Sequence, residues 1–523
     1  MNALLQLLFI FGFIDYSLQQ LAQKPNIIFI LVDDLGWNDV GFHGLNQFPT
    51  PNIDALAYAG IILNEYYVAP LCSPTRAALM TARHPIHTGI YSWLDSRTPT
   101  GLALDEKLLP QYLKELNYTS HIVGKWHLGF FREEYTPTFR GFDQHYGYFT
   151  GQLDYWTYWH MQSTGYLGFD MRNGTNVDYD ITGEYLTRHL SHKAVQVIEN
   201  HDTTKPLFLY VAHHATHSTN YPEDSLQAPQ ETIDQFTYIE DQNRRTFAAM
   251  VSELDTSVGE IVTALGGRGM LENSIIVFST DNGGTAGGYD NSAASNWPLR
   301  GTKNTQKMQV QDWLPTLLGA LEEAPNNPPY PLDGINAWGA LSDPTQNIRN
   351  EVLHMIEPDL GYSAITIDNW KLSIGTTTDS NGSHWNDWYG PAGRNESYDV
   401  NLVQTSPVAR ALSSTSRPVP LNLEILRLRN EATLLQCTNM PNVTSCDPLS
   451  SEPCLFDLST DHCEQNNLAE SEPDILNQML AALEVYNATV VPNIAQPVDQ
   501  RSNPIFWNNT WISWNDVTQP DCA

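Results

Sequence analysis

The stretch Asn26-Ile27-Ile28-Phe29-Ile30-Leu31-Val32 runs directly into Asp33-Asp34-Leu35-Gly36. An apolar run of this length, without alternating polar residues, is typical of a central strand that is covered on both faces of a parallel sheet. Such strands belong to α/β folds, in which ligands bind beyond the carboxyl ends of the strands. The stretch therefore predicts an α/β protein with a candidate site at Asp33 and Asp34.

Three further apolar runs end in polar residues in the same way. Residues 274–280 lead into Asp281 and Asn282, residues 206–211 lead into His213, His214 and His217, and the short run 121–123 leads into Lys125 and His127. Because the carboxyl ends of parallel strands meet at one edge of a sheet, we expect these side chains to converge with Asp33 and Asp34.

The chemistry of this set follows from the residue types. The oxygen atoms of Asp33, Asp34, Asp281 and Asn282 favour a hard divalent cation, Ca²⁺ or Mg²⁺, over zinc. An Asp-Asp pair after a strand is also common as a turn or helix cap, and lone histidines are often core residues. The matched Asp-Asn pair after a second strand favours the metal site, beside which histidines serve as acid or base groups.

A second informative stretch begins at Cys72-Ser73-Pro74-Thr75-Arg76 and continues to Arg83. Pro74 suits the first turn of a helix, which places Cys72 at the helix N-terminus, where anions are stabilised. Arg76 and Arg83 lie two turns apart, so we expect one of these charges to point back toward Cys72. A lone cysteine is more often a buried thiol or a disulfide, but this pattern favours an anion site around a modifiable sulfur.

Composition limits the remaining choices. With 523 residues, the chain is long enough for two domains and a large core. Its net charge of −32 argues against nucleic acids and anionic membranes as partners, since both require basic surfaces. The apolar run 4–14 is too short to span a bilayer and predicts a signal peptide over residues 1–23; no later run predicts a membrane span.

Glycosylation and cysteine patterns agree with a secretory route. N-glycans are predicted at Asn117, Asn173, Asn381, Asn395, Asn442, Asn487 and Asn508, each of which begins an Asn-x-Ser/Thr pattern. Five of the six cysteines fall in the last quarter of the chain, at positions 437, 446, 454, 463 and 522, which predicts disulfides there without fixing their pairing. We expect a lysosomal or extracellular protein.

The pattern changes near residue 350. Residues 364–367 and 370–374 flank Asp368-Asn369 and predict a hairpin, residues 455–458 predict a further strand, and residues 475–483 have helical spacing. We therefore expect a catalytic α/β domain over residues 24–348 and a C-terminal α+β subdomain over residues 349–523, the latter with a small antiparallel sheet and a packed helix.

These motifs, taken together, resemble the type I sulfatase family, and within it the arylsulfatase B (N-acetylgalactosamine-4-sulfatase) branch. The matching segments follow the family order and occupy residues 33–44, 72–83, 124–129, 140–143, 280–284, 296–301 and 312–316. Sulfatases usually have Gly where this chain has Ala82. The resemblance implies an alkaline-phosphatase-like sandwich, with a large mixed, mostly parallel sheet between helices. It also implies hydrolysis of a sulfated sugar or of a small aryl or xenobiotic sulfate.

The resemblance further implies the cofactors and the residue roles. Cys72 is oxidised to formylglycine by the formylglycine-generating enzyme during secretion, and Ca²⁺ is held by Asp33, Asp34, Asp281, Asn282 and residue 72. One hydroxyl of the hydrated aldehyde attacks sulfur, and the other then loses a proton, which expels sulfate. Arg76 and Lys125 are expected to hold the diol, His127 to act as base, and His217 and Lys303 to bind sulfate and assist the leaving oxygen.

One departure from the family pattern affects the expected sheet. Sulfatases continue after the equivalent of Lys303 with a Trp-Glu-Gly-Gly-x-Arg segment and another core strand, whereas here only the mostly polar residues 304–311 precede Asp312. Losing a strand exposes apolar neighbours and unpaired backbone groups, so we expect a less stable form. Two alternatives follow: an inactive secreted glycoprotein or splice form that lacks a core segment, and a phosphoesterase of the same superfold, which the presence of Cys72 disfavours.

Overall fold

The computed structural model describes residues 24–518, except for 65, 182, 220, 222–223, 287–291, 300–307, 344–345, 347, 376–389, 434–443, 445 and 447–451. The predicted signal peptide, Lys303, Asn381 and Asn442 therefore lie outside the described residues. Within the described part, no helix combines the length and the apolar character needed to cross a membrane.

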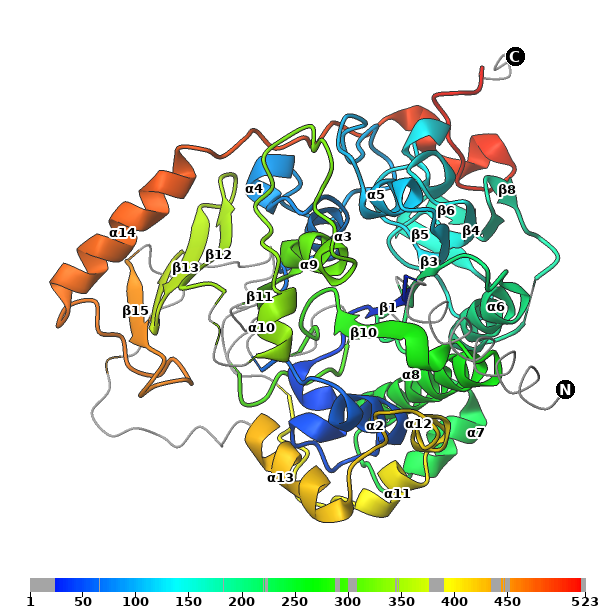
Figure 1. The fold of residues 1–523 in the computed structure, drawn as a ribbon. Coiled ribbons are helices and arrows are strands. Elements are labelled where there is room, and N and C mark those ends of the chain that lie inside the picture. The colour runs from blue at the N-terminus through cyan, green and yellow to red at the C-terminus, as the bar shows by residue number, and fades with distance from the viewer. Residues whose placement is uncertain are drawn as a thin grey trace, which may run out of the picture.

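The centre of the molecule is a mixed sheet in which five adjacent strands are parallel (Figure 1). Its strand order is β10-β1-β9-β3-β4-β7-β8. The strands are β1 (Asn26–Val32), β3 (Thr119–Lys125), β4 (Gln144–Tyr148), β7 (Arg172–Asn173), β8 (Asn176–Val177), β9 (Leu207–Ala212) and β10 (Ser274–Thr280). The four strands predicted from the sequence are confirmed, and all four belong to the parallel part.

Every residue of β1 is buried, because helices cover both faces of the sheet. Ile28 and Ile30 face one apolar cluster, whereas Ile27 and Phe29 face a second cluster on the opposite side. The first cluster includes α2 (Pro51–Ala59), α6 (Leu186–Asn200) and α8 (Gln242–Gly267), and the second includes α3 (Cys72–Thr81), α5 (Leu109–Glu115) and α9 (Trp313–Ala320). This two-sided burial is the physical reason for the uninterrupted apolar run in the sequence.

A separate antiparallel sheet of order β12-β13-β14-β15 lies beside the large one, with helix α14 against it (Figure 1). It contains β12 (Glu351–Glu357), β13 (Tyr362–Ile367), β14 (Trp370–Ile374) and β15 (Cys454–Asp457), and α14 spans Pro473–Asn487. The predicted hairpin, strand and helix are therefore confirmed. Cys446 and Cys454 form a disulfide and Cys463 is also disulfide-bonded, as the clustering of cysteines predicted.

Not all of the chain beyond residue 348 packs on this small sheet. Helices α11 (Val400–Gln404) and α12 (Pro407–Leu412) contact α2, and Trp511 and Trp514 pack against Phe130 beside the large sheet. The remaining elements are short: α4 (Pro85–Thr88), α7 (Gln230–Ile233), α10 (Trp338–Ser342), α13 (Asn422–Ala432), and the paired strands β2 (Tyr66–Tyr67) with β11 (Met308–Gln309) and β5 (Trp159–Ser163) with β6 (Tyr166–Phe169). The segment that we expected to form one C-terminal subdomain thus packs partly on the small sheet and partly on the elements around the large sheet.

Helix α3 begins at Cys72, as predicted, but it ends at Thr81, before Arg83. Ala82 has a φ of 59°, a left-handed conformation that costs an L-residue with a Cβ roughly 1–2 kcal/mol and explains why glycine suits this position. Because the chain leaves the helix there, Arg83 turns away and pairs with Glu106. The expectation that Arg76 and Arg83 lie two turns apart on one helix is therefore wrong.

Strand β10 lies at one edge of the large sheet, and no other described strand pairs with its outer side. Its apolar residues Ile275, Ile276 and Phe278 are only half-buried, in contrast to the fully buried β1. Strand β11, which precedes Asp312, pairs with β2 and not with β10. Within the described residues, the outer edge of β10 therefore has no pairing strand, at the place where the resemblance to sulfatases predicts one.

Insertion of the expected strand-forming segment between the positions of Lys303 and Asp312 should stabilise the protein, because it would cover Ile275 and Phe278 and pair the outer backbone groups of β10. We expect the thermal midpoint to rise by a few degrees, roughly 2–4 °C for each kcal/mol gained. Differential scanning calorimetry of both forms measures this change. Equal midpoints and equal turnover in the two forms would refute the idea that this edge is a weak point.

Two buried carboxyl groups lie on helices α2 and α8, and one of them joins the two helices. Asp255 of α8 accepts hydrogen bonds from the backbone N–H groups of Asn52 (3.0 Å) and Ile53 (2.8 Å), and Asp54 accepts one from the Tyr398 hydroxyl (2.7 Å). Burial nevertheless raises the pKa of Asp255 to about 7 and the pKa of Asp54 to about 6. Between about pH 4 and 7 the folded state therefore keeps protons that the unfolded chain has released.

This proton binding should make the free energy of unfolding fall as the pH rises from about 4 to 7, because both folded-state pKa values lie above the unfolded ones. Replacing Asp255→Asn removes one of these groups and should flatten the pH dependence, even though it lowers stability at every pH. The exposed Asp234→Asn variant serves as the control and should keep the wild-type slope. Denaturant titrations at several pH values measure the slopes; identical slopes for Asp255→Asn and wild type would contradict the assignment.

Candidate functional site

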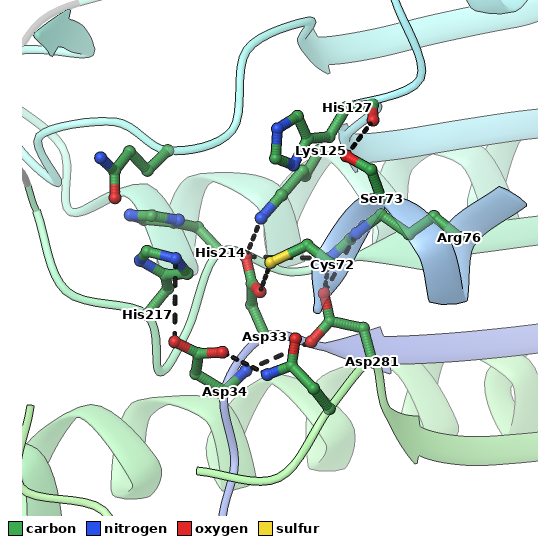
Figure 2. A network of polar contacts seen from close by, with 12 residues as sticks. Asp33, Asp34, Cys72, Ser73, Arg76, Lys125, His127, His214, His217 and Asp281 are labelled. Carbon is green, nitrogen blue, oxygen red and sulfur yellow. Dashed lines mark hydrogen bonds and ion pairs between the residues drawn. The ribbon is translucent and has the colours of Figure 1, made fainter. Parts of the chain in front are cut away.

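The polar residues that follow the strands meet at one edge of the large sheet (Figure 2). The strands end level with one another, since Val32 of β1 pairs with Thr280 of β10 and Gly124 of β3 pairs with Ala212 of β9. Helix α3 brings its first residue, Cys72, to the same place. The sequence-predicted residues that the structure brings together are Asp33, Asp34, Cys72, Arg76, Lys125, His127, His217, Asp281 and Asn282.

A buried network of opposite charges forms the base of the site. Lys125 Nζ lies 2.6 Å from Asp33 Oδ2, and Arg76 Nη2 lies 2.9 Å from Asp281 Oδ2 and 3.7 Å from Asp33 Oδ2. All four side chains are at most 1% exposed. Removing one partner from such a cluster leaves an uncompensated buried charge, which costs about 3–5 kcal/mol.

The pKa values in this network reflect competition between burial and charge. Burial raises the pKa of Asp33, but the charges of Lys125, His217 and Arg76 outweigh it and hold this pKa below its usual value. The pKa of Asp281 is raised instead, by burial and by the neighbouring Asp33 carboxylate, against the pull of Arg76. Burial lowers the pKa of Lys125, yet Asp33 reverses this and raises it. The charged form of the Asp33–Lys125 pair is therefore favoured, with Asp33 as the centre of the network.

Cys72 Sγ points into this network, 3.5 Å from Asp33 Oδ1. Its pKa is raised well above the usual value, chiefly by burial and further by Asp281, Asp33 and Asp34, although Lys125 opposes this. The unmodified thiol is therefore held in its neutral form, and the predicted anion site around a modifiable sulfur stays a prediction. A neutral thiol is a weak nucleophile.

Oxygen atoms that could bind a cation lie next to these ion pairs, on Asp33, Asp34 and Asn282. Ligand atoms of Asp33, Asp34, Cys72 and His217 lie within 4.8 Å of one another. Asn282 donates its side-chain N–H to Asp34 Oδ1, while its own Oδ1 is buried without a hydrogen-bond partner. An orphaned buried acceptor beside two carboxylates fits a hard cation, which would accept this oxygen as a ligand.

Two histidines differ in the nitrogen atom that they present to the site. His127 Nε2 lies 3.1 Å from the Leu94 carbonyl oxygen, which only accepts, so Nε2 carries the proton and the buried, unpartnered Nδ1 is an acceptor. Burial, with help from Lys125 and Arg76, holds the pKa of His127 well below its usual value. His217 donates from Nδ1 to the Ser218 carbonyl oxygen (2.7 Å), which leaves Nε2 facing Asp34 Oδ2 at 3.7 Å.

The structure adds residues that the sequence did not single out for a role. Tyr148 ends β4 at the same edge of the sheet, and its buried hydroxyl group has no hydrogen-bond partner. His214 stacks on His217, with ring centroids 5.6 Å apart, and Ser73 Oγ donates to the His127 carbonyl oxygen (2.9 Å). The position of Tyr148 at the end of a strand could have revealed it, but Gln144–Tyr148 lacks the apolar run that marked the other strands.

Comparison with known proteins identifies the family. A family model described as Sulfatase matches residues 25–321. Arylsulfatase J of Mus musculus is 35% identical over 541 residues, an alignment that covers 94% of this chain and 81% of that protein. N-acetylgalactosamine-6-sulfatase of Mus musculus is 33% identical over 322 residues and covers 57% of this chain and 58% of that protein.

Solved structures agree on the fold. Ps i-CgsB superimposes with a TM-score of 0.66 at 26% identity, covering 90% of this chain and 94% of its own. The PsFucS1 sulfatase from Pseudoalteromonas sp. gives 0.62 at 22% identity, covering 91% and 92%. The predicted alkaline-phosphatase-like architecture is therefore confirmed. The matched family model and the long alignment with an arylsulfatase show that this chain belongs to the sulfatase family and is a sulfatase enzyme.

Proposed function

We propose that this sulfatase removes sulfate from sulfated sugars through a formylglycine that is made from Cys72 and works beside a bound Ca²⁺. The observation that carries the proposal is the position of Cys72 Sγ, which lies 3.5 Å from Asp33 Oδ1 at the start of α3, inside the Asp33–Lys125 and Arg76–Asp281 network. The neutral buried thiol is unsuited to attack in its encoded form. Its oxidation to an aldehyde, whose hydrate carries two hydroxyl groups, supplies an oxygen nucleophile at the same point.

The charges of the site support a divalent cation. Asp33, Asp34 and Asp281 contribute three negative charges when ionised, and Arg76 and Lys125 contribute two positive ones. A divalent ion changes the resulting balance from one net negative charge to one net positive charge, which matches a singly charged sulfate ester. When bound, Ca²⁺ stabilises the negative charge that develops on the transferring group. Asp33, Asp34, Asp281 and Asn282 would hold it, with the oxygen that replaces the Cys72 sulfur.

Each side chain has a role that its hydrogen bonds permit. Lys125 and Arg76 are fixed by Asp33 and Asp281, so they would hold the nucleophilic hydroxyl groups in place. His127 presents an unprotonated Nδ1 and would accept the proton of the second hydroxyl group, which expels sulfate. His217 exchanges protons through Nε2 and, together with Lys303, would bind sulfate and assist the leaving oxygen.

The substrate and the location form the less specific part of the proposal. Relatives named arylsulfatase and N-acetylgalactosamine-6-sulfatase support a sulfated hexosamine or an aryl sulfate, and the arylsulfatase B branch remains our proposal for the subgroup. The disulfide Cys446–Cys454 supports a lysosomal or extracellular protein. Exposure of the described predicted glycan sites supports the same route: Asn117, Asn173, Asn395, Asn487 and Asn508.

Two substitutions of Cys72 test the nucleophile. Cys72→Ala should lower kcat/KM for an aryl sulfate by at least about three orders of magnitude, because the attacking oxygen is lost. Cys72→Ser keeps one hydroxyl group but cannot complete the elimination, so it should release at most one equivalent of alcohol and retain a covalent sulfate. Product measurement in the first turnovers and intact mass analysis give these results.

The wild-type protein provides the decisive control for this test. The peptide that contains residue 72 should carry formylglycine in every active preparation. Turnover by protein whose Cys72 is unconverted would end the proposed mechanism. Protein that carries formylglycine but cleaves no member of a panel of sulfated sugars and aryl sulfates would favour the inactive-glycoprotein alternative.

Removal of calcium tests the cation. Chelation should lower both the activity and the thermal midpoint, since a ligand at 100 times its Kd stabilises the folded state by about 2.7 kcal/mol. Asn282→Ala should weaken calcium binding at least tenfold, because it removes the orphaned buried oxygen. Asn52→Ala, which alters a buried amide on α2, is the matched control and should retain the wild-type affinity. Unchanged stability and activity after chelation would contradict the assignment.

A further inference from the structure

A second cavity lies between the large sheet and helix α6, away from the site described above. Its volume is about 450 Å³, within the range of sites for small molecules. Its walls come from the first residues of β3, from β4, from the second half of α6 and from the loop 201–205 that leads into β9. Thr119 of this cavity and Lys125 of the catalytic edge lie at opposite ends of β3, roughly 20 Å apart along the strand. We call this cavity the β3–α6 pocket.

The ionisable groups of the β3–α6 pocket are mainly basic, although the whole chain has a net charge of −32. Lys193 and Lys205 line it, and among the described residues neither lysine forms an ion pair with a carboxylate. The one acidic residue in the lining, Asp202, is exposed and accepts hydrogen bonds from the N–H and the hydroxyl of Thr204. Two lysines without ion pairs in a strongly acidic protein create a local attraction for anions.

The histidines His121 and His145 belong to the structural wall of the pocket. Burial lowers the pKa of His121, and its Nδ1 has no hydrogen-bond partner. The nearby Asp143 is engaged by Lys114 (3.2 Å) and by the Ser120 N–H (2.9 Å). The Nδ1 atom of His121 is itself buried, so this imidazole belongs to the wall of the pocket and does not reach a ligand. His145 likewise lies within reach of two backbone carbonyl oxygens and is part of the structure.

The remaining walls suit a sugar ring. The Tyr146 ring lies below Lys193, whose Nζ is 4.4 Å from the ring centroid, and the side chains of Gln144 and Gln196 line the cavity. Side-chain amides offer both donors and acceptors to the hydroxyl groups of a sugar, while the cation–π contact with Tyr146 places the Lys193 ammonium group at the wall of the cavity. A cavity of this volume is also much larger than a single sulfate or phosphate ion requires.

We propose that the β3–α6 pocket is a second binding site, which takes a sugar that bears an anionic group. Lys193, which lies against the Tyr146 ring, and Lys205 bind the anionic group, and the amides of Gln144 and Gln196 bind hydroxyl groups. The proposal does not depend on the chemistry at Cys72, because the pocket lies at the opposite end of the strands. It concerns binding and involves no reaction.

Titration calorimetry of the full-length protein with glucose 6-sulfate, glucose 6-phosphate, glucuronate and glucose tests this proposal. At low salt, at least one of the anionic sugars should bind tenfold or more tightly than glucose, and binding should weaken as salt screens the lysines. The double variant Lys193→Gln/Lys205→Gln should lose this difference, while its kcat and KM for an aryl sulfate stay at the wild-type values. The ranking of the three anionic sugars identifies the preferred group.

A charge-matched control separates the pocket from the active site and from overall charge. Lys24→Gln/Lys107→Gln removes the same number of charges from residues outside the pocket and should bind all four sugars as the wild type does. Equal binding by both double variants would place the ligand elsewhere and overturn the proposal. Inorganic sulfate that binds as tightly as glucose 6-sulfate would overturn the sugar part. Because Asn173 also lines the pocket and is a predicted glycan site, all titrations use the Asn173→Gln background, which lacks this glycan and adds no charge.

Discussion

The buried carboxylate of Asp33 is the constraint on which the site depends. It receives Lys125 from β3 and Arg76 from α3, and Arg76 in turn is held by Asp281 at the end of β10. A charge buried this deeply is tolerated only when its partners are placed accurately. The carboxyl ends of β1, β3 and β10 and the first turns of α3 must therefore lie at the same edge of the sheet. The parallel register of β1 with β9 and β10 aligns the ends of these strands. Burying the Asp33 carboxylate costs free energy, and the ion pairs that offset this cost also fix the geometry of the site.

Much of this arrangement could be predicted from two features of the sequence, the long apolar runs and the polar residues that follow them. Strands β1, β9 and β10 are continuous apolar runs, since helices cover the sheet, and the polar residues after them mark the ligand edge. Strand β4 lacked this signal because Gln144–Tyr148 contains polar and glycine residues, and Tyr148 was missed with it. Arg83 was placed wrongly because Ala82 ends α3 in a left-handed conformation that an alanine does not indicate. The raised pKa of the Cys72 thiol could not be predicted either, because it follows from burial in the folded protein and from the nearby carboxylates of Asp281, Asp33 and Asp34.

The two candidate binding regions use the acidic chain in opposite ways. At the catalytic edge, carboxylates outnumber the lysine and arginine, and the orphaned oxygen of Asn282 marks where a cation would complete the balance. In the β3–α6 pocket the lysines outnumber the single carboxylate of Asp202, so this region attracts anions without help from a metal. Local composition, rather than the overall charge of −32, decides which ligand each region favours.

The burial of Cys72 also bears on when the proposed oxidation could occur relative to folding. Its side chain is only 6% exposed, and it lies at the head of a helix whose residues are all buried. Another protein's catalytic groups cannot reach this sulfur once the two apolar clusters have closed around the sheet. The proposed oxidation of Cys72 would therefore have to happen on the nascent or still unfolded chain, before folding buries the sulfur. Under the same proposal, a chain that folds first would keep its thiol, so the timing of synthesis as well as the sequence would decide whether a given molecule becomes active.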